Sequence, residues 1–210
     1  MRNVKIVNGV PATKSSFGSY YGERIFDVSG EKFREWIPWR SKLSAVILKG
    51  YEIDFRGNEK ILYLGAASGT TASHLADIVD KGVIYAIEFS AKPFMRLLEL
   101  SRERENIIPI LGDASKPWEY SGIVEKVDFI YEDVAQKNQI EILELNSEFF
   151  LKDSGEFMIM VKAKSIDSTI EAKEIFPSVL RRISKTFSIL GKGELEPYHR
   201  DHIFIHGVKK

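Results

Sequence analysis

Short apolar runs alternate with segments of helical spacing over the last three quarters of the chain. The apolar runs predict buried strands at 60–64, 82–88, 107–111, 127–131 and 155–161. Apolar residues at helical spacing predict helices at 70–79, 93–104, 136–150 and 170–183. This alternation is typical of a parallel sheet with right-handed crossovers. Two extended segments, 186–190 and 201–208, follow each other closely and predict an antiparallel hairpin at one sheet edge.

The pattern is different before residue 57. Short β-like pieces at 4–7, 20–21 and 24–28 are separated by glycines and by Pro11, which predicts a small antiparallel sheet of hairpins. A helical segment follows and stops at Gly50. We therefore expect two units, a small N-terminal β-rich domain at 1–56 and an α/β, Rossmann-like domain at 57–210.

Composition narrows the classes of function only a little. The chain of 210 residues carries 30 basic and 30 acidic side chains, so its net charge does not indicate a nucleic-acid binder. It has no cysteine, which excludes disulfides, thiolate zinc sites and a cysteine nucleophile, and we expect no metal site. No apolar run is long enough for a membrane span and no targeting segment is visible, so we expect a cytoplasmic location and no membrane partner.

Polar or acidic residues follow the predicted strands where each one ends. Ligands of open α/β sheets bind beyond these carboxyl ends, at the point where the strand order reverses. The ends carry a glycine loop at 65–71, then Glu88 with Phe89, Asp113 with Ala114, a segment at 132–136 and finally Lys162. We expect these groups to share one crevice.

The glycine loop is the first candidate for binding. Gly65 and Gly69 allow tight turns, and Thr70 and Thr71 open the helix that follows, whose N-terminus favours an anion. Ala67 stands where a dinucleotide-binding loop has its middle glycine, which disfavours a pyrophosphate and an NAD-dependent reductase. A smaller carboxylate, such as that of methionine, remains compatible, and so does a plain βα turn with no ligand.

The strand-end acids extend this interpretation. Glu88 lies 23 residues after Gly65, close to the ~20 expected for an acid that holds ribose hydroxyls. Phe89 is suited to stack on an adenine and Asp113 to accept from its amino group. Taken alone, Glu88 is equally a solvated acid and Asp113 an Asx turn. Together with the loop, the set predicts an adenosine-containing cofactor.

Asp133 and Lys162 end two successive strands, and Lys42 adds a second amine from an upstream turn. A simple salt bridge is one interpretation. The other is catalytic, because two amines in one cleft repel each other and favour the neutral form of one of them. A neutral lysine can accept a proton or orient a hydroxyl group.

Six segments together resemble the fibrillarin family, in its shorter archaeal form, over nearly the whole chain. They are Tyr63-Leu64-Gly65-Ala66-Ala67-Ser68-Gly69-Thr70-Thr71, Tyr85-Ala86-Ile87-Glu88-Phe89-Ser90, Asp113-Ala114, Asp133-Val134-Ala135-Gln136, Pro197-Tyr198-His199-Arg200-Asp201-His202 and Trp39-Arg40-Ser41-Lys42-Leu43. The resemblance implies a Rossmann-like class I methyltransferase fold and methylation of ribose 2′-hydroxyls in rRNA, and also in tRNA, with S-adenosylmethionine as cofactor. It also implies a box C/D ribonucleoprotein containing a guide RNA, a target RNA, a Nop-domain scaffold protein and a kink-turn-binding, ribosomal-protein-like subunit.

The resemblance also assigns residues to roles. Its catalytic set corresponds to Lys42, Asp133 and Lys162, with His202 as a candidate fourth member that is otherwise a histidine satisfied near the terminal strand. The cofactor-binding set that we expect is Gly65, Ala67, Thr70, Thr71, Glu88, Phe89, Asp113, Ala114, Asp133, Val134, Ala135 and Gln136. A methyltransferase for a protein or a small molecule, and a non-catalytic scaffold subunit, remain the alternatives.

Overall fold

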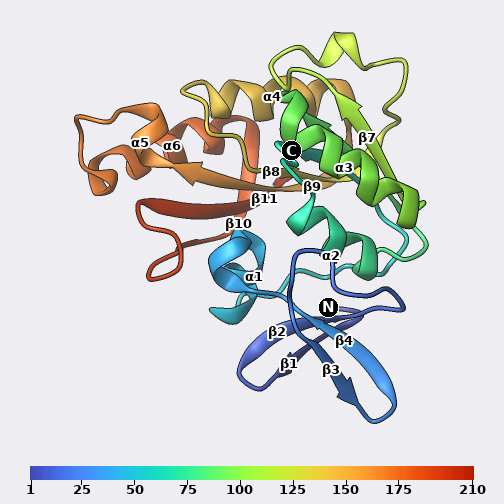
Figure 1. Cartoon of the computed structure of the whole chain (residues 1–210). Coiled ribbons are helices and arrows are strands. Elements are labelled where there is room, and N and C mark those ends of the chain that lie inside the picture. Colours follow the sequence, from blue (N-terminus) through green and yellow to red (C-terminus); the bar gives the residue numbers. More distant parts are fainter.

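A seven-stranded sheet forms the centre of the computed structural model, which describes all 210 residues (Figure 1). Its spatial order is β10-β11-β9-β8-β5-β6-β7. The strands are β5 (Lys60–Leu64), β6 (Val83–Glu88), β7 (Ile107–Leu111), β8 (Val127–Glu132), β9 (Leu151–Lys162), β10 (Phe187–Glu194) and β11 (His202–Lys209). Strands β5 to β9 pair in parallel, and β11 and β10 add antiparallel at one edge, as the sequence predicts.

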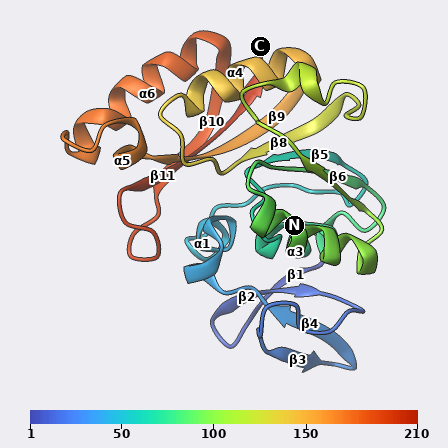
Figure 2. The ribbon, with the colours of Figure 1, turned by 45° about the horizontal axis from the view of Figure 1, so that its top comes forward.

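Helices cover both faces of this sheet (Figure 2). One face carries α1 (Lys42–Leu48), α2 (Thr70–Ile78) and α3 (Ala91–Glu103), and the other carries α4 (Gln139–Phe150), α5 (Ala163–Ile166) and α6 (Ala172–Thr186). Successive strand residues point to opposite faces, so Ile61 belongs to the hydrophobic cluster beneath α2 and Leu62 to the cluster beneath α4. Burial on both faces explains why these strands appear in the sequence as continuous apolar runs. None of the helices is long and apolar enough to span a membrane.

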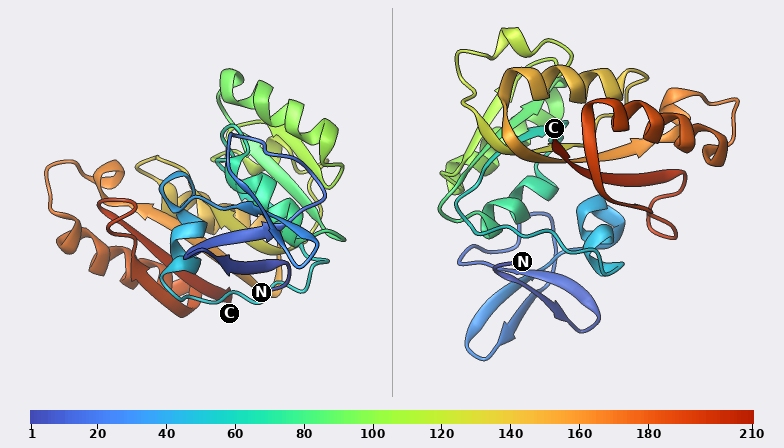
Figure 3. Two further views of the ribbon diagram at one scale, coloured as in Figure 1. Left: turned by 60° about the horizontal axis from the view of Figure 1, so that its bottom comes forward. Right: turned by 180° about the vertical axis from the view of Figure 1, so that it is seen from behind.

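The N-terminal extension is a separate antiparallel sheet on the far side of α2 (Figure 3). It contains β1 (Val4–Val7), β2 (Val10–Lys14), β3 (Ile25–Val28) and β4 (Glu31–Glu35), in the order β1-β2-β4-β3. Residues Trp36, Leu43 and Phe55 follow it and belong to the same hydrophobic cluster as Ile61. The proposed division between residues 56 and 57 stays a prediction.

The sequence did not indicate two of these four strands. β2 contains Pro11, which we interpreted as a strand breaker. Pro11 lies outside the stretch of β2 that pairs with β4, so its missing N–H removes no hydrogen bond to that strand. β4 is mostly charged, yet Arg34 within it is fully buried because acidic side chains surround it. The predicted β piece at 20–21 is wrong, since both residues lie in a loop.

Several element boundaries also differ by a few residues from the sequence expectation, as α4 and β9 show. The helix expected from Gln136 begins at Gln139, because residues 133–136 form the loop that leaves β8. β9 is longer at both ends than expected, since Leu151 pairs with Val127 before a register shift and the polar residues 152–154 stay within the strand. Neither difference moves the strand ends at which we expected a ligand.

Candidate active site

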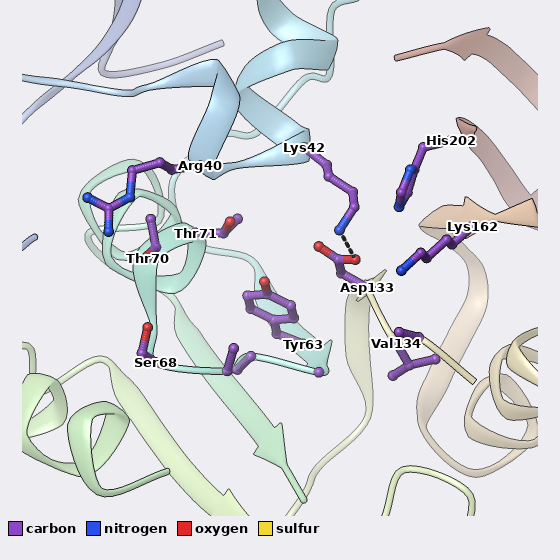
Figure 4. Close-up of a pocket in the computed structure, with 14 residues that line it drawn as sticks. Arg40, Lys42, Tyr63, Ser68, Thr70, Thr71, Asp133, Val134, Lys162 and His202 are labelled. Carbon is purple, nitrogen blue, oxygen red and sulfur yellow. Dashed lines mark hydrogen bonds and ion pairs between the residues drawn. The ribbon is translucent and has the colours of Figure 1, made fainter. Parts of the chain in front are cut away.

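A cavity of about 370 Å³ opens at the carboxyl ends of β5 and β8 (Figure 4). The chain leaves β5 toward β6 on one side, while β8 flanks β5 on the other, so this is the point where the strand order reverses. The cavity is lined by Arg40, Lys42, Tyr63, Gly65, Ala66, Ala67, Ser68, Thr70, Thr71, Asp133, Val134, Ala135, Lys162 and His202. It therefore brings together all four predicted catalytic residues and seven of the predicted cofactor-binding residues: Gly65, Ala67, Thr70, Thr71, Asp133, Val134 and Ala135.

The glycine loop forms one wall. Gly65 has a φ of +82°, and a Cβ there would lie 2.6 Å from the Asp133 carbonyl oxygen, so this position has room for no side chain. Ala67 also has a positive φ, of 49°, and its backbone N–H donates to Glu88 Oε2 at 2.8 Å. The Glu88 carboxylate thus fixes the loop, while the first turn of α2 presents its free backbone amides beside Thr70.

A cluster of charged and polar side chains forms the opposite wall. Lys42 Nζ donates to Asp133 Oδ1 at 2.6 Å, with 20% and 19% of the two side chains exposed. Lys162, the last residue of β9, is the register partner of His202, the first residue of β11. Figure 4 shows the side chains of Lys162 and His202 directed toward the Lys42–Asp133 pair. The two adjacent strands β9 and β11 therefore place an amine and an imidazole side by side.

Lys42 is positioned by the start of α1. Ser41 caps this helix, and its hydroxyl lies 2.9 Å from the Thr71 hydroxyl at the start of α2. Ser41, which precedes the α/β domain in the sequence, therefore contacts the end of the glycine loop directly. This contact explains how a side chain so far from β8 in sequence reaches Asp133.

Two histidines beside the cluster are held in defined states. Burial lowers the pKa of His202, and burial also lowers the pKa of His199, so both rings are neutral at pH 7. His202 Nδ1 lies 2.6 Å from the Arg200 carbonyl oxygen, which can only accept, so Nδ1 carries the proton. The Nε2 lone pair of His202 is then available as an acceptor.

Five predicted cofactor-binding residues lie outside the lining of this cavity. Glu88 binds the backbone amides of Ala67 and Ser90, and Phe89 is 68% exposed. Asp113 accepts from the amide and hydroxyl of Ser115, which is the Asx turn considered as its alternative role. Ala114 is buried and its carbonyl accepts from Asn146, and the Gln136 carbonyl accepts from Gln139.

These outer residues nevertheless continue the same edge of the sheet. The strands β8, β5, β6 and β7 are neighbours in that order, and Asp133, Gly65, Glu88 and Asp113 respectively lie at their carboxyl ends or within two residues beyond them. Three strand spacings separate the first end from the last, about 15 Å. An extended ligand along this edge would meet all four ends.

The sequence did not single out Arg40, Tyr63 or Ser68, which also line the cavity. Arg40 is two positions before Lys42, and Tyr63 and Ser68 flank the loop at Gly65, so proximity to predicted site residues was the available signal. No sequence pattern indicated that the 19–23 loop approaches the site. There the Tyr20 hydroxyl donates to the Ser68 carbonyl at 2.5 Å.

Comparison with known proteins places this architecture in a family. The family model described as Fibrillarin matches residues 6–210. A fibrillarin-like rRNA/tRNA 2′-O-methyltransferase from Archaeoglobus fulgidus is 65% identical over 209 residues, covering 100% of this chain and 98% of the relative.

Two solved structures are similarly close. A fibrillarin from a fibrillarin/Nop5p complex is 65% identical, with a TM-score of 0.95 and coverage of 100% of this chain and 98% of the other. A fibrillarin from Aeropyrum pernix with natively bound S-adenosyl-L-methionine is 42% identical, with a TM-score of 0.86 and coverage of 98% and 93%. The sequence-based resemblance and the Rossmann-like methyltransferase fold are thus confirmed, and the chain belongs to the fibrillarin family.

Proposed function

We propose that this chain transfers a methyl group from S-adenosylmethionine to the ribose 2′-hydroxyl of RNA. One observation carries the proposal: in a fibrillarin-family fold, one cavity has a glycine loop on one wall and the Lys42, Asp133, Lys162 and His202 cluster on the other. The 65% identical relative is a fibrillarin-like rRNA/tRNA 2′-O-methyltransferase, which supports rRNA and tRNA as substrate classes.

The residues present fit this cofactor. Gly65 lets the loop pass directly against the Asp133 backbone, and α2 offers free amides to a carboxylate. Glu88 and Asp113 each have carboxylate lone pairs beyond those used for the loop and the turn, which suits the ribose hydroxyls and the adenine amino group. We propose that the twelve residues expected from the sequence form this site. When bound, S-adenosylmethionine supplies a methyl group activated on a sulfonium.

The task left to the protein is to hold the ribose hydroxyl and to accept its proton. Asp133 holds Lys42 at 2.6 Å, so Lys42 keeps a fixed charged donor at the cavity wall. This donor orients the hydroxyl oxygen and stabilises negative charge that develops on it. Asp133 thereby acts mainly through the position of Lys42.

The other two residues of the cluster, Lys162 and His202, are the candidates for accepting the proton. Lys162 pairs with no carboxylate, so its amine is free to approach the hydroxyl, and we keep it as the proposed base. His202 offers a second acceptor, because its ring is neutral and its Nε2 lone pair is free. Methylation rates of variants at Lys162 and at His202 distinguish between these two proton acceptors.

We further propose that the chain works inside a box C/D ribonucleoprotein. The solved relative in complex with Nop5p supports a Nop-domain scaffold as partner. The kink-turn-binding subunit and the guide RNA follow from the family resemblance. A chain of zero net charge then needs little affinity of its own for RNA, since guide–target pairing selects the nucleotide.

The test is methyl transfer from labelled cofactor in the complex reconstituted with partner proteins, guide RNA and matched target RNA. We expect label in one nucleotide as a 2′-O-methyl group, and none when that nucleotide carries a 2′-deoxyribose. The chain alone should methylate poorly. Label on a base, or on a partner protein in place of RNA, would overturn the proposal and favour the protein-methyltransferase alternative.

A further inference from the structure

An exposed arginine occupies the end of the cavity away from the catalytic cluster. Arg40 lines the cavity together with Ser68 and Thr70, and Figure 4 shows it on their side, across from Lys162 and His202. No carboxylate forms an ion pair with Arg40, although Glu99 lines the adjoining groove. A guanidinium group beside the amide-rich start of α2 places two positive features together without a protein anion between them.

Arg40 is held in place by Tyr21. Its Nη1 donates to the Tyr21 carbonyl at 3.1 Å, and its Cζ lies 5.0 Å from the centroid of the Tyr21 ring. Arginine has five N–H donors, so this single bond leaves the rest of the fork for another partner. A side chain that is anchored but mostly unsatisfied is suited to bind a ligand with little loss of conformational freedom.

Tyr21 is in turn fixed by the N-terminal sheet. Its hydroxyl lies 2.8 Å from His74 Nε2, and His74 Nδ1 lies 2.8 Å from the Thr13 hydroxyl of β2. Thr13 donates its own proton to Asp77, so His74 Nδ1 donates to Thr13 and Nε2 accepts from Tyr21. Burial lowers the pKa of His74 well below its usual range, which keeps the ring in this neutral form.

We infer that Arg40 is an oxyanion-binding residue of the active site and that the N-terminal sheet positions it through Tyr21. The oxyanion is either the carboxylate in the methionine half of the cofactor or a phosphate of the target RNA, since either would reach the cavity in the reaction. The inference rests on the proposed function, because both anions belong to ligands of that reaction. The antiparallel sheet thereby becomes part of the active site as well as of the fold.

The cofactor arm of the test uses the chain alone and calorimetry. The probes are S-adenosylhomocysteine and S-adenosyl-3-thiopropylamine, which lacks only the carboxylate. If the oxyanion is the carboxylate, Arg40→Ala weakens binding of the first by about 10- to 100-fold and leaves binding of the second unchanged. Arg96→Ala is the matched control, since Arg96 lines the adjoining groove but not the cavity, and it should change neither.

The RNA arm uses the reconstituted complex at saturating cofactor. If the oxyanion is a phosphate, Arg40→Ala raises the KM for target RNA by about 10-fold, leaves both calorimetric affinities unchanged and makes binding less sensitive to salt. Arg40→Lys should recover part of either loss, because it restores a charge without the planar fork.

The role of Tyr21 has its own pair of variants. Tyr21→Phe keeps the carbonyl and the ring that Arg40 contacts but removes the hydroxyl that bonds to His74, so it should lose a small part of the affinity, for cofactor or for RNA, that is assigned to Arg40. Tyr21→Ala removes the ring and should lose part of it, while the Arg40→Ala,Tyr21→Ala double variant should lose no more than Arg40→Ala alone.

Two results separate failure of the inference from failure of the proposed function. A folded Arg40→Ala variant with unchanged affinities for both probes and an unchanged KM for RNA would overturn the inference while methylation of RNA continues. Conversely, a wild-type complex that does not methylate RNA would overturn the proposed function, and the calorimetric arm would still report on Arg40.

Discussion

Two clusters of charged side chains in this protein differ in how completely the fold satisfies them. In the N-terminal extension, Arg34 is fully buried and donates to Glu23 and Asp77, both at 2.7 Å. At the strand ends, Lys42 and Asp133 form a single pair at 2.6 Å with about a fifth of each side chain exposed. Arg34 therefore has its hydrogen-bonding capacity used within the protein, whereas the strand-end cluster keeps capacity for a substrate.

The two clusters also differ in how far they could be predicted from the sequence. The strand-end cluster was predicted because each member stands at the end of an apolar run, and parallel strands bring such ends together. The Arg34 cluster joins a strand, a loop and a helix that are far apart in the chain, and no local pattern indicates that pairing. For the same reason the sequence missed β4, whose charges appear exposed until their partners are known.

The site shows a similar division. Local motifs predicted Gly65, Thr70, Thr71 and Asp133 as parts of one cavity, because the βα turn positions the first three and the parallel pairing of β8 with β5 brings Asp133 beside them. Arg40 depends on its contact with Tyr21, and the free Nε2 of His202 depends on the carbonyl of Arg200. Contacts of this kind arise only after the N-terminal extension and the terminal hairpin have packed against the sheet.

The largest effect should come from breaking the strand-end pair. Asp133→Ala leaves Lys42 without the acceptor that fixes it, and we expect methyl transfer in a single turnover to fall by about 10²–10⁴-fold. The free energy of unfolding should change by less than about 1 kcal/mol, because the pair is partly exposed. A variant that loses both rate and stability would place this pair with the structural cluster.

Breaking the buried cluster should have the opposite result. Arg34→Ala leaves the buried carboxylate of Glu23 without its ion-pair partner and leaves that of Asp77 with Arg104 alone, and we expect a loss of about 3–5 kcal/mol in the free energy of unfolding, measured by denaturant titration. At saturating ligands, the rate of the folded fraction should stay within a few-fold of wild type. Arg24→Ala is the control, since Arg24 pairs with Glu35 while 66% exposed and should cost at most about 1 kcal/mol.

Glu88 combines a structural role with a proposed binding role, because its carboxylate fixes the glycine loop and is also proposed to hold the cofactor ribose. Glu88→Ala should weaken S-adenosylmethionine binding by about 1–3 kcal/mol in calorimetry. Glu88→Gln keeps one carbonyl oxygen for the loop and should lose less. Unchanged affinity in a folded Glu88→Ala variant would leave Glu88 with the structural role alone.

The smallest expected effect concerns Glu132, which is fully buried next to Asp133 and has no hydrogen-bond partner for either oxygen. Burial raises the pKa of Glu132 well above its usual range. The folded protein therefore favours protonated Glu132. The stability that comes from this preference is fully present below the unfolded-state pKa of about 4.3 and is lost as pH rises through the raised pKa of the folded state. Glu132→Gln, which stays neutral, should therefore gain stability over wild type as pH rises, on the order of 1 kcal/mol in denaturant titrations at pH 5 and pH 9. A constant difference between the two pH values would contradict this prediction.

The role of Lys162 as the base is tested by the single-turnover rate of RNA methylation by the wild-type and Lys162→Arg complexes across a pH series. Arginine keeps the charge but stays protonated, so it cannot accept the proton of the ribose hydroxyl. We predict that Lys162→Arg lowers the rate by about 10²–10⁴-fold at the pH values where the wild-type rate is highest, that this difference narrows toward low pH, and that the affinity for S-adenosylmethionine stays nearly unchanged. A Lys162→Arg complex that keeps the wild-type rate across the series would contradict Lys162 as the base and leave His202 as the proton acceptor of the cluster.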